Sequence, residues 1–246
     1  MSASQILIVG PSWVGDMVMA QSLFKTLKKN QFGCQVDVLA PGWTFSLLER
    51  MPEITKTIEM PLGHGNLGLK QRVVLGKQLR SNHYDQAILL PNSWKSALTP
   101  FFADIPLRTG FIGECRWGLL NDIRRLDKSH LKMTVQRFVA LGLPKNNNLP
   151  PDCPIPELYI DEKNQQSVIE KFRLDTEGKI LALCPGAEYG PAKRWPSHQY
   201  AEVAKQKLSQ GWQVWLFGSE KDKPVTEEIN QLTKGACVDF TGLTTL

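Results

Sequence analysis

The first stretch able to do chemistry is "QILIVGPSWVGDMVMAQSLFKTL", residues 5–27, in which an apolar run meets a glycine-flanked loop and then a helical pattern. Gly10 and Gly15 have the spacing of the phosphate-binding loop G-x-x-x-x-G-K-[ST], whose backbone N–H groups hold phosphates. Asp16 stands where that loop needs Lys, and Met17 stands where it needs Ser or Thr. Because a carboxylate repels a phosphate, the sequence argues against a P-loop nucleotide hydrolase.

Asp16 could have two roles, which are compatible with one another. At the beginning of a helix, a carboxylate caps free backbone N–H groups or complements the helix dipole, and this structural role is the commoner one for a single Asp. The same dipole favours the ionised carboxylate, which could then accept a proton from a substrate hydroxyl as a general base.

The second stretch able to do chemistry is "CPGAEYGPAKRWP", residues 184–196. Pro196 and the amphipathic pattern after it predict that a helix begins here. Free N–H groups, the helix dipole and the ammonium of Lys193 would together form an anion site, and Gly186 would let the backbone approach a ligand. The alternative, that Lys193 and Arg194 are a solvated basic pair, is the commoner outcome for such a dipeptide.

Further candidates follow other expected strand ends. Glu220 lies just past a strand, where dinucleotide-binding folds place an acid on ribose hydroxyls, although a surface Glu is common. Two more loops could receive an anionic or sugar acceptor, or could be solvated faces, and they carry Asn92, Ser93, Lys95, Arg116 and Trp117.

Alternating strands and helices must position these residues. In the first half, strands are expected at 5–10, 35–40, 54–60 and 84–91, and helices at 15–30, 42–51, 68–81 and 93–103, before the segments 107–112 and 130–143 close the unit. This alternation is typical of a parallel sheet covered on both faces. Ligands of open α/β sheets bind beyond the carboxyl ends of the strands, where the candidate residues are expected.

A linker divides the chain. Residues 144–156, "PKNNNLPPDCPIP", hold five prolines and three asparagines. The alternation then restarts, with strands expected at 179–186, 213–218 and 237–242 and helices at 164–174, 197–211 and 223–235. We therefore predict the α/β class, with two Rossmann-like parallel-sheet domains, 1–150 and 151–246, facing a cleft.

Composition indicates a folded protein, and its mild, dispersed positive charge is compatible with an anionic partner or with simple solubility. Of the 246 residues, 42% are hydrophobic and 22% are charged, which indicates a packed core. The five scattered cysteines include no C-x-x-C pair, so neither a disulfide framework nor a zinc site is expected. The net charge of +5 is compatible with a phospholipid surface, a phosphorylated lipid or nucleic acid. Without a signal peptide or an apolar run of about 18 residues, the chain is expected in the cytoplasm.

The motifs "GPSWVGDMVMAQSL", "LPNSWKSALTPFFADIPLRTGF", "RWGLLNDIR" and "CPGAEYGPAKRWP" together resemble the bacterial ADP-heptose:lipopolysaccharide heptosyltransferases of glycosyltransferase family 9. The resemblance covers the whole chain. It implies a GT-B architecture and an inverting transfer of heptose from ADP-heptose to the anionic inner core of lipopolysaccharide. It also implies a monomer, peripheral at the cytoplasmic face of the inner membrane, that uses no cofactor or metal and binds no nucleic acid. The absence of a D-x-D sequence agrees with a metal-free reaction.

The resemblance assigns roles residue by residue. Asp16, in the family's S-x-x-G-D loop, is the catalytic base. Lys193, in the K-x-W signature, meets the donor diphosphate as ADP leaves. The donor-binding residues are expected to be Gly186, Ala187, Glu188, Lys193 and Glu220. The acceptor-binding residues are expected to be Ser12, Gly15, Ser93, Lys95, Arg116 and Trp117.

The family continues past the position of Leu246 with sequence that completes the nucleotide site. We therefore expect this chain to be an N-terminal portion, with a truncated second domain and weakened nucleotide affinity. Two alternatives stay open: a transferase of the same family that acts on another core sugar, and a non-catalytic Rossmann-like binding module. Specific ADP binding would distinguish an enzyme from a module, whereas only the close motif match favours a heptose as the acceptor.

Overall fold

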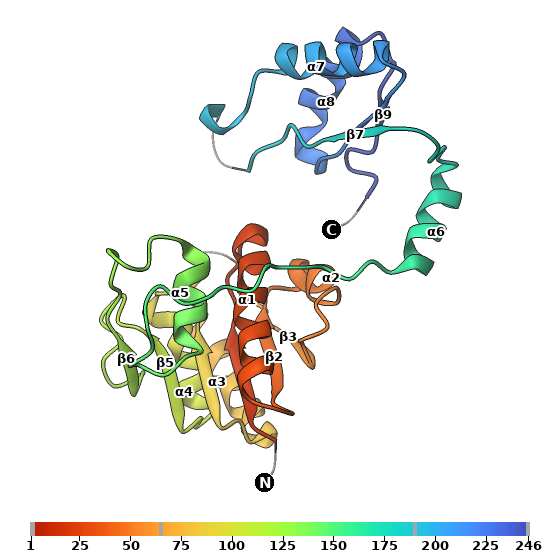
Figure 1. The fold of residues 1–246 in the computed structure, drawn as a ribbon. Coiled ribbons are helices and arrows are strands. Elements are labelled where there is room, and N and C mark those ends of the chain that lie inside the picture. Colours follow the sequence, from red (N-terminus) through yellow and green to blue (C-terminus); the bar gives the residue numbers. More distant parts are fainter. Residues whose placement is uncertain (1–2, 64–65, 189–190, 245–246) are drawn as a thin grey trace. The chain divides into compact units, whose positions relative to one another are not determined.

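The computed structural model of the chain describes residues 3–63, 66–188 and 191–244. The chain divides into two compact units, Met1–Ile160 and Asp161–Leu246. Figure 1 shows that each unit contains a parallel sheet flanked by helices, so the predicted α/β class with two parallel-sheet units is confirmed.

The first unit contains a six-stranded parallel sheet in the order β3-β2-β1-β4-β5-β6. Its strands are β1 (Gln5–Val9), β2 (Gln35–Ala40), β3 (Lys56–Glu59), β4 (Gln86–Leu89), β5 (Leu107–Phe111) and β6 (Asp122–Arg124). Successive strands are added outward from β1 first on one side and then on the other, so the order reverses between β1 and β4. Such a switch point leaves a crevice beyond the carboxyl ends of the two strands.

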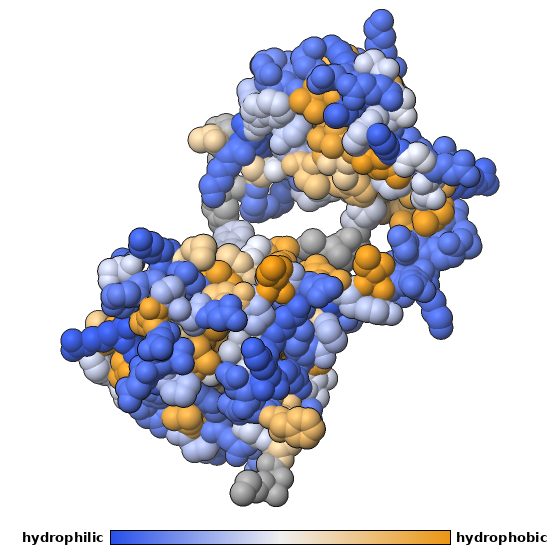
Figure 2. Space-filling view, in the orientation of Figure 1, coloured by the Kyte–Doolittle hydropathy of each residue, from blue (hydrophilic) through white to orange (hydrophobic). Residues whose placement is uncertain are grey.

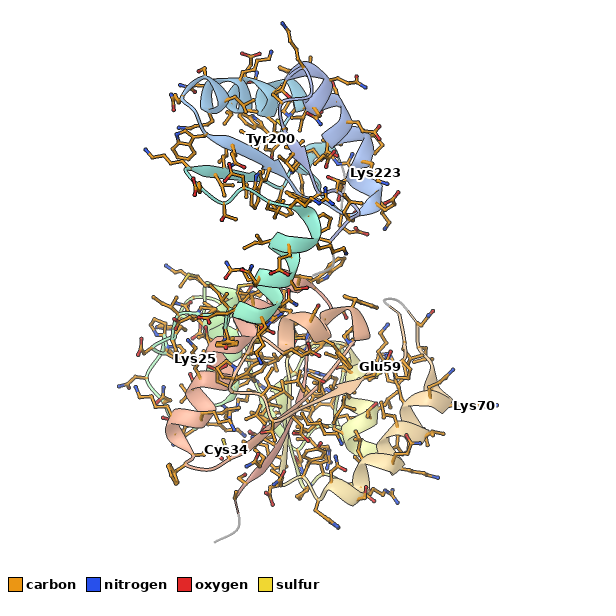
Figure 3. The ribbon with its side chains drawn as sticks, turned by 90° about the vertical axis from the view of Figure 1, so that its right-hand side faces the viewer. Lys25, Cys34, Glu59, Lys70, Tyr200 and Lys223 are labelled. Atoms are coloured by element: carbon orange, nitrogen blue, oxygen red, sulfur yellow. The ribbon has the colours of Figure 1, made fainter. Side chains whose placement is uncertain are left out.

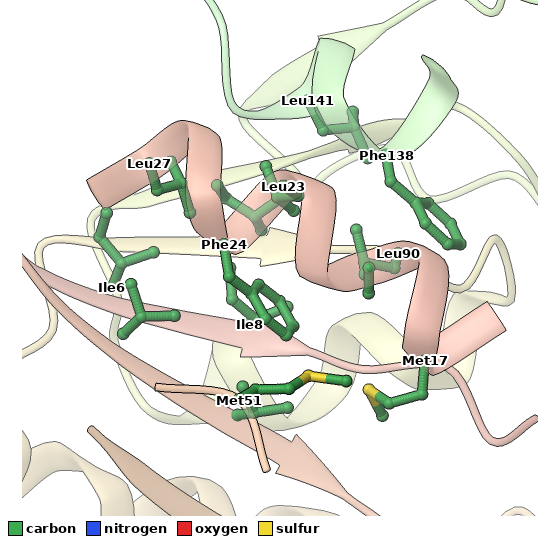
Figure 4. Packing of buried hydrophobic residues seen from close by; sticks show 14 of the residues in the cluster. Ile6, Ile8, Met17, Leu23, Phe24, Leu27, Met51, Leu90, Phe138 and Leu141 are labelled. Carbon is green, nitrogen blue, oxygen red and sulfur yellow. The ribbon is translucent and has the colours of Figure 1, made fainter. Parts of the chain in front are cut away.

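Helices cover both faces of this sheet. They are α1 (Val14–Asn30), α2 (Phe45–Leu48), α3 (Leu69–Leu79), α4 (Leu98–Phe102) and α5 (Thr134–Leu141). Because alternate residues of a strand point to opposite faces, Ile6 and Ile8 of β1 pack with α1 and α5, as Figure 4 shows. Leu7 and Val9 pack on the other face with α3 and with the alanines that flank α4.

Strand β6 is not predicted from the sequence pattern, because it is short and polar and lies at the sheet edge. Its residue Asp122 is held by hydrogen bonds rather than by apolar packing. The carboxylate accepts from Thr109 Oγ1 at 2.9 Å and from Arg124 Nη2 at 3.0 Å, and it pairs with Lys145 at 2.9 Å. These contacts tie the edge strand to β5 and to the chain after α5.

Residues 151–160 belong to the first unit, because side chains of α1 bind their backbone. The fully buried Gln21 donates to Glu157 O at 2.7 Å and accepts from Glu157 N at 2.8 Å. The hydroxyl of Ser22, also fully buried, donates to Pro154 O at 2.6 Å. Part of the proline-rich stretch is therefore fixed on α1, and the compact units separate after Ile160.

The second unit contains a three-stranded parallel sheet in the order β7-β8-β9. Its elements are α6 (Glu162–Phe172), β7 (Ile180–Leu183), α7 (Ser197–Ser209), β8 (Gln213–Leu216), α8 (Lys223–Leu232) and β9 (Val238–Asp239). Val214 and Leu216 of β8 pack with Ala201 of α7 and Ile229 of α8. The other face carries an aromatic cluster made of Phe172, Trp215, Phe217 and Phe240.

The surface is mainly polar. In Figure 2 hydrophilic residues cover most of the visible face, and apolar residues form scattered patches. Figure 3 shows charged side chains such as Lys70 of α3 directed away from the sheet. Among the described residues, none of the helices combines the length and the apolar composition that a membrane span needs.

Candidate functional site

A cavity of about 330 Å³ lies at the switch point of the first sheet. The loop after β1 lines it with Ser12, the first turn of α1 with Asp16, the loop after β4 with Asn92, and α5 with Arg137. Its volume is at the lower end of the range of ligand pockets, about 300–1,000 Å³. The candidate base predicted from the sequence therefore lies where an open α/β sheet binds its ligands.

Asp16 lies in the first turn of α1, as predicted, but it is not the N-cap residue. That position is taken by Trp13, whose side chain makes no capping hydrogen bond. Within residues 3–63, 66–188 and 191–244, no group donates a hydrogen bond to the carboxylate of Asp16. The carboxylate complements the helix dipole and stays available to a ligand in the cavity.

Packing explains one of the two glycines that give this loop its P-loop-like spacing, Gly10, but not the other. A Cβ atom at Gly10 would lie 2.8 Å from Met17 Cε and 3.3 Å from Val38 Cγ1. Gly10 therefore lets the first turn of α1 pack closely on the end of the sheet. A Cβ atom at Gly15 would meet no other atom within 4 Å, so packing does not require glycine there.

A second cavity, of about 380 Å³, adjoins the first, because both are lined by Ser12 and Asn92. It also contains the predicted residues Ser93 and Lys95. Lys95 Nζ lies 3.5 Å from Asn66 O, a weak contact that leaves its charge accessible. The cavity thus presents hydroxyl groups and an ammonium to a ligand.

Arg72 contributes a second cation to this cavity, and sequence reasoning missed it. It lies on α3 and is buried, with Nε donating to Leu67 O at 2.7 Å and Nη1 lying 3.8 Å from Met60 Sδ. Burial lowers the pKa of its guanidinium. The signal in the sequence that could have found Arg72 is a charged residue at a position of α3 that faces the core. An anionic group would recover part of the desolvation cost of this cation.

Arg116 and Trp117, expected on the acceptor side, have opposite environments. Arg116 is fully buried, and its guanidinium donates to Pro91 O and Phe111 O. Burial lowers the pKa of Arg116 to about 10, although the charge of Glu114 raises it. Arg116 lines neither cavity. The side chain of Trp117 is exposed to solvent.

Lys193 ends a short 3-10 turn, Pro191–Lys193, in the second unit. Its side chain is exposed, and no described residue pairs with its ammonium. Helix α7 begins at Ser197 after Pro196, as the sequence predicts. Arg194 Nη2 lies 3.4 Å from Ala187 O, so this neighbour contacts its own loop. Tyr189 and Gly190 of the same predicted loop lie outside the described residues.

Two acids, Glu220 and Asp222, lie over the carboxyl ends of the second sheet. A side chain at Gly186 would collide with the carboxylate of Asp222, and one at Gly242, which has φ of +72°, would collide with Glu220. These glycines therefore let the acids approach the backbone closely. Glu220 pairs with Lys223 (labelled in Figure 3) at 2.6 Å.

Glu188, the other acid among the predicted donor-binding residues, lies in the loop after β7 and pairs with Lys221 at 3.2 Å. The loops after β7 and β8 are therefore in contact. All five predicted donor residues lie at this edge of the second sheet or in the loop that follows β7. Among the described residues, no group of three or more His, Cys, Asp or Glu side chains could hold a metal ion.

Comparison with known proteins identifies the family. Residues 72–246 match the model of glycosyltransferase family 9 (heptosyltransferase). The chain is 48% identical over 251 residues to lipopolysaccharide heptosyltransferase 2 of Salmonella typhimurium, covering 98% of this chain and 72% of that protein. It is 50% identical over 230 residues to the Escherichia coli protein of the same name, covering 92% of this chain and 66% of that protein.

A solved structure gives the same result. The Escherichia coli ADP-heptose lps heptosyltransferase II superposes with a TM-score of 0.87 at 44% identity, covering 98% of this chain and 73% of that one. The chain thus spans about two thirds to three quarters of the length of these relatives. A match to most of the chain, together with relatives of nearly 50% identity, shows that the chain belongs to glycosyltransferase family 9, the heptosyltransferases.

Proposed function

We propose that the protein transfers heptose from ADP-heptose to a heptose of the lipopolysaccharide inner core, with inversion at the anomeric carbon. The observation that carries this proposal is the carboxylate of Asp16, which has no partner among the described residues and lines a cavity at the switch point. The names of the relatives, lipopolysaccharide heptosyltransferase 2 and ADP-heptose lps heptosyltransferase II, support the choice of donor and acceptor.

In the proposed reaction, Asp16 accepts the proton of the acceptor hydroxyl. The hydroxyl oxygen then forms a bond to the anomeric carbon of the donor heptose. The bond between that carbon and the diphosphate oxygen breaks, and ADP leaves with the electron pair. The ammonium of Lys193 meets the negative charge that develops on ADP. A charge-assisted contact of this kind contributes roughly 1.5–3 kcal/mol.

The first unit, residues 1–160, provides the acceptor side, and the second unit, residues 161–246, provides the nucleotide-sugar side. The cavity that contains Arg72 and Lys95 suits an acceptor that carries acidic groups, because two cations and only one acid, Glu114, are among the described residues that line it. Gly186, Ala187 and Glu188 would contact the donor together with Lys193. Glu220 would bind the ribose, for which it must release or share Lys223.

An acceptor anchored in lipid requires the enzyme to work at a membrane surface. We therefore include in the proposal a peripheral association of a monomer with the cytoplasmic face of the inner membrane. The excess of basic residues, which gives a net charge of +5, supports attraction to an anionic lipid surface.

A transfer assay with two acceptors tests the proposed function. The purified protein would be incubated with ADP-heptose and either a core oligosaccharide that ends in one heptose or the same oligosaccharide without that heptose. The proposal predicts transfer to the first acceptor and little to the second. Preference for the second acceptor would assign the chain to another ADP-heptose transferase of the family. Absence of transfer to either acceptor, together with absence of specific ADP binding, would favour a non-catalytic module.

A further inference from the structure

The largest of the fully buried side chains in the described residues is a cation, Arg116. Moving a charged group out of water destabilises the folded protein unless hydrogen bonds or a counter-charge offset the cost. The acid whose charge acts on Arg116 is Glu114, which is itself exposed to solvent. Neutral acceptors must therefore compensate most of the burial of this guanidinium.

The acceptors found for the guanidinium of Arg116 lie at two neighbouring strand ends. Nη1 donates to Pro91 O at 2.8 Å and lies 3.4 Å from Ser96 Oγ. Nη2 donates to Phe111 O and lies 3.5 Å from Asn92 Oδ1. Three of the four acceptors belong to the chain after β4, and Phe111 ends β5. The rigid fork of one arginine thus joins the loop after β4 to the end of β5.

Further contacts join the loop after β4 to the residues just before Arg116. Glu114 N donates to Asn92 O at 3.1 Å, and Trp94 N donates to Glu114 Oε2 at 3.2 Å. Gly113 has φ of +43°, and a side chain there would collide with Asn92 O. Only glycine allows the loops to approach this closely. The position of the loop after β4 therefore depends on the loop that carries Arg116.

The loop held in this way carries the predicted acceptor residues Ser93 and Lys95, which line the larger cavity, whereas Arg116 does not. We propose that Arg116 is a positioning residue that holds residues 91–97 in the shape that presents Ser93 and Lys95 to the acceptor, without touching the acceptor itself. This inference rests on the acceptor role proposed for the cavity.

Amide hydrogen exchange of Arg116→Lys in the intact protein tests the positioning role without any substrate. Lysine keeps the charge but cannot bond to several acceptors in the fixed geometry of a guanidinium. We expect amides of residues 91–97 to exchange about tenfold faster or more than in the unsubstituted protein. Unchanged exchange in this segment would overturn the proposal. If the variant does not fold, Arg116→Gln, whose shorter neutral side chain cannot reach both Pro91 O and Phe111 O, is expected to raise exchange in the same segment as well, and no change there would have the same consequence.

Arg124→Lys is the matched control. Arg124 also donates to backbone carbonyls, Ala140 O at 2.7 Å and Leu143 O at 2.5 Å, but it lies on the edge strand β6 and lines neither cavity. Its substitution is expected to lower the Tm but to leave the exchange of residues 91–97 unchanged. Equal exchange increases in both variants would show only general destabilisation and would contradict the proposal.

Kinetics then connect the positioning role to the acceptor. Arg116→Lys is expected to raise the acceptor KM about tenfold and to leave the donor KM nearly unchanged. Because the effect passes through the loop that carries Lys95, the same substitution is expected to have a much smaller effect in a Lys95→Ala background. Fully multiplicative effects would instead indicate that Arg116 binds the acceptor directly. Absence of heptose transfer by the unsubstituted protein would defeat the proposed function while leaving the exchange result valid.

Discussion

At the scale of single residues, the two proposed catalytic charges differ from their neighbours in having no partner in the described part of the chain. Arg194 contacts Ala187 O, and Glu220 pairs with Lys223, whereas neither Asp16 nor Lys193 makes a comparable contact. An unpaired charge on a solvated surface is common by itself. For Asp16 the cavity at the switch point adds a place for a ligand, and Lys193 lies just before the beginning of α7, whose free N–H groups favour an anion.

Substitution of Lys193 by Ala is expected to lower turnover and to weaken donor binding together. The ammonium would contact the diphosphate before the reaction and more strongly as ADP leaves, and loss of such a charge-assisted contact costs about 1.5–3 kcal/mol. Arg194→Ala is the matched control and is expected to have a smaller effect, because Arg194 already contacts its own loop. Steady-state kinetics with varied ADP-heptose measure both. A larger loss in Arg194→Ala would show that the roles of the two residues are exchanged.

Residue types and spacing were sufficient to select Asp16 and Lys193 as candidates, but they could not predict which cations are buried. Arg116 looks like an exposed loop residue in the sequence, because burial depends on how two loops that follow different strands come together. Arg72 is not recognised either, since its cavity is formed by residues from several strand ends. Both assignments require the tertiary structure.

At the scale of elements, the prediction is most accurate where hydrophobic periodicity is strong. The expected strand at 35–40 coincides with β2, and the helix expected at 15–30 is α1, which begins one residue earlier. The helix expected at 42–51 is shorter, with a 3-10 turn before α2, and the strand expected at 237–242 forms only β9. Strand β6 escapes prediction because it is short and only its Ile123 packs on the core, while polar contacts of Asp122 hold it to β5 and to Lys145.

The stability contributed by β6 is expected to depend on pH through Asp122. Although burial raises the pKa of this carboxyl, hydrogen bonds from Lys145, Arg124 and Thr109 outweigh that effect and lower the pKa below its usual value. A depressed folded-state pKa stabilises the protein above the unfolded pKa, and the contribution is lost as the pH falls through the folded value. Asp122→Asn is therefore expected to cost roughly 1–3 kcal/mol near neutral pH and less below about pH 4.

Urea unfolding of Asp122→Asn and of the unsubstituted protein at several pH values measures this difference. Asp152→Asn is a suitable control, since Asp152 is exposed and accepts no hydrogen bond from a described residue. A difference that stays constant between neutral and acid pH would show that the carboxylate charge of Asp122 does not stabilise the edge strand.

At the scale of the whole molecule, each unit is a parallel α/β sheet whose candidate residues lie at the carboxyl ends of its strands. The alternating sequence pattern predicts such a sheet but does not contain the strand order. That order, with β4 beside β1, is what brings the loop of Asp16 next to the loop of Asn92 and creates the two adjoining cavities. The sequence could therefore predict the edge of the sheet on which the site lies. Which residues from different loops line the same cavity is known only from the structure.

The acceptor KM is expected to rise with salt concentration, because the acceptor cavity presents Arg72 and Lys95 and the chain carries a net charge of +5. Raising the ionic strength from about 0.05 M to about 0.5 M shortens the Debye length and screens these charges. Lys95→Gln is expected to raise the acceptor KM and to reduce its dependence on salt. Lys205→Gln, which removes an exposed cation paired with Glu202 on α7, should change neither. An unchanged salt dependence in Lys95→Gln would place the acidic acceptor elsewhere.

The central claim is that Asp16 is the general base, and turnover of Asp16→Asn tests it most directly. The amide is nearly isosteric with the carboxylate and adds no volume to the cavity, but it cannot take a proton. General base catalysis supplies roughly 10²–10⁴ in rate, so kcat is expected to fall by that factor while the donor KM and the Tm change little. Glu162→Gln, which removes an acid from the first turn of α6, controls for the loss of a helix-dipole charge. Near-normal turnover of Asp16→Asn would contradict the account, because Asp16 would then serve only the helix and the base would be another residue.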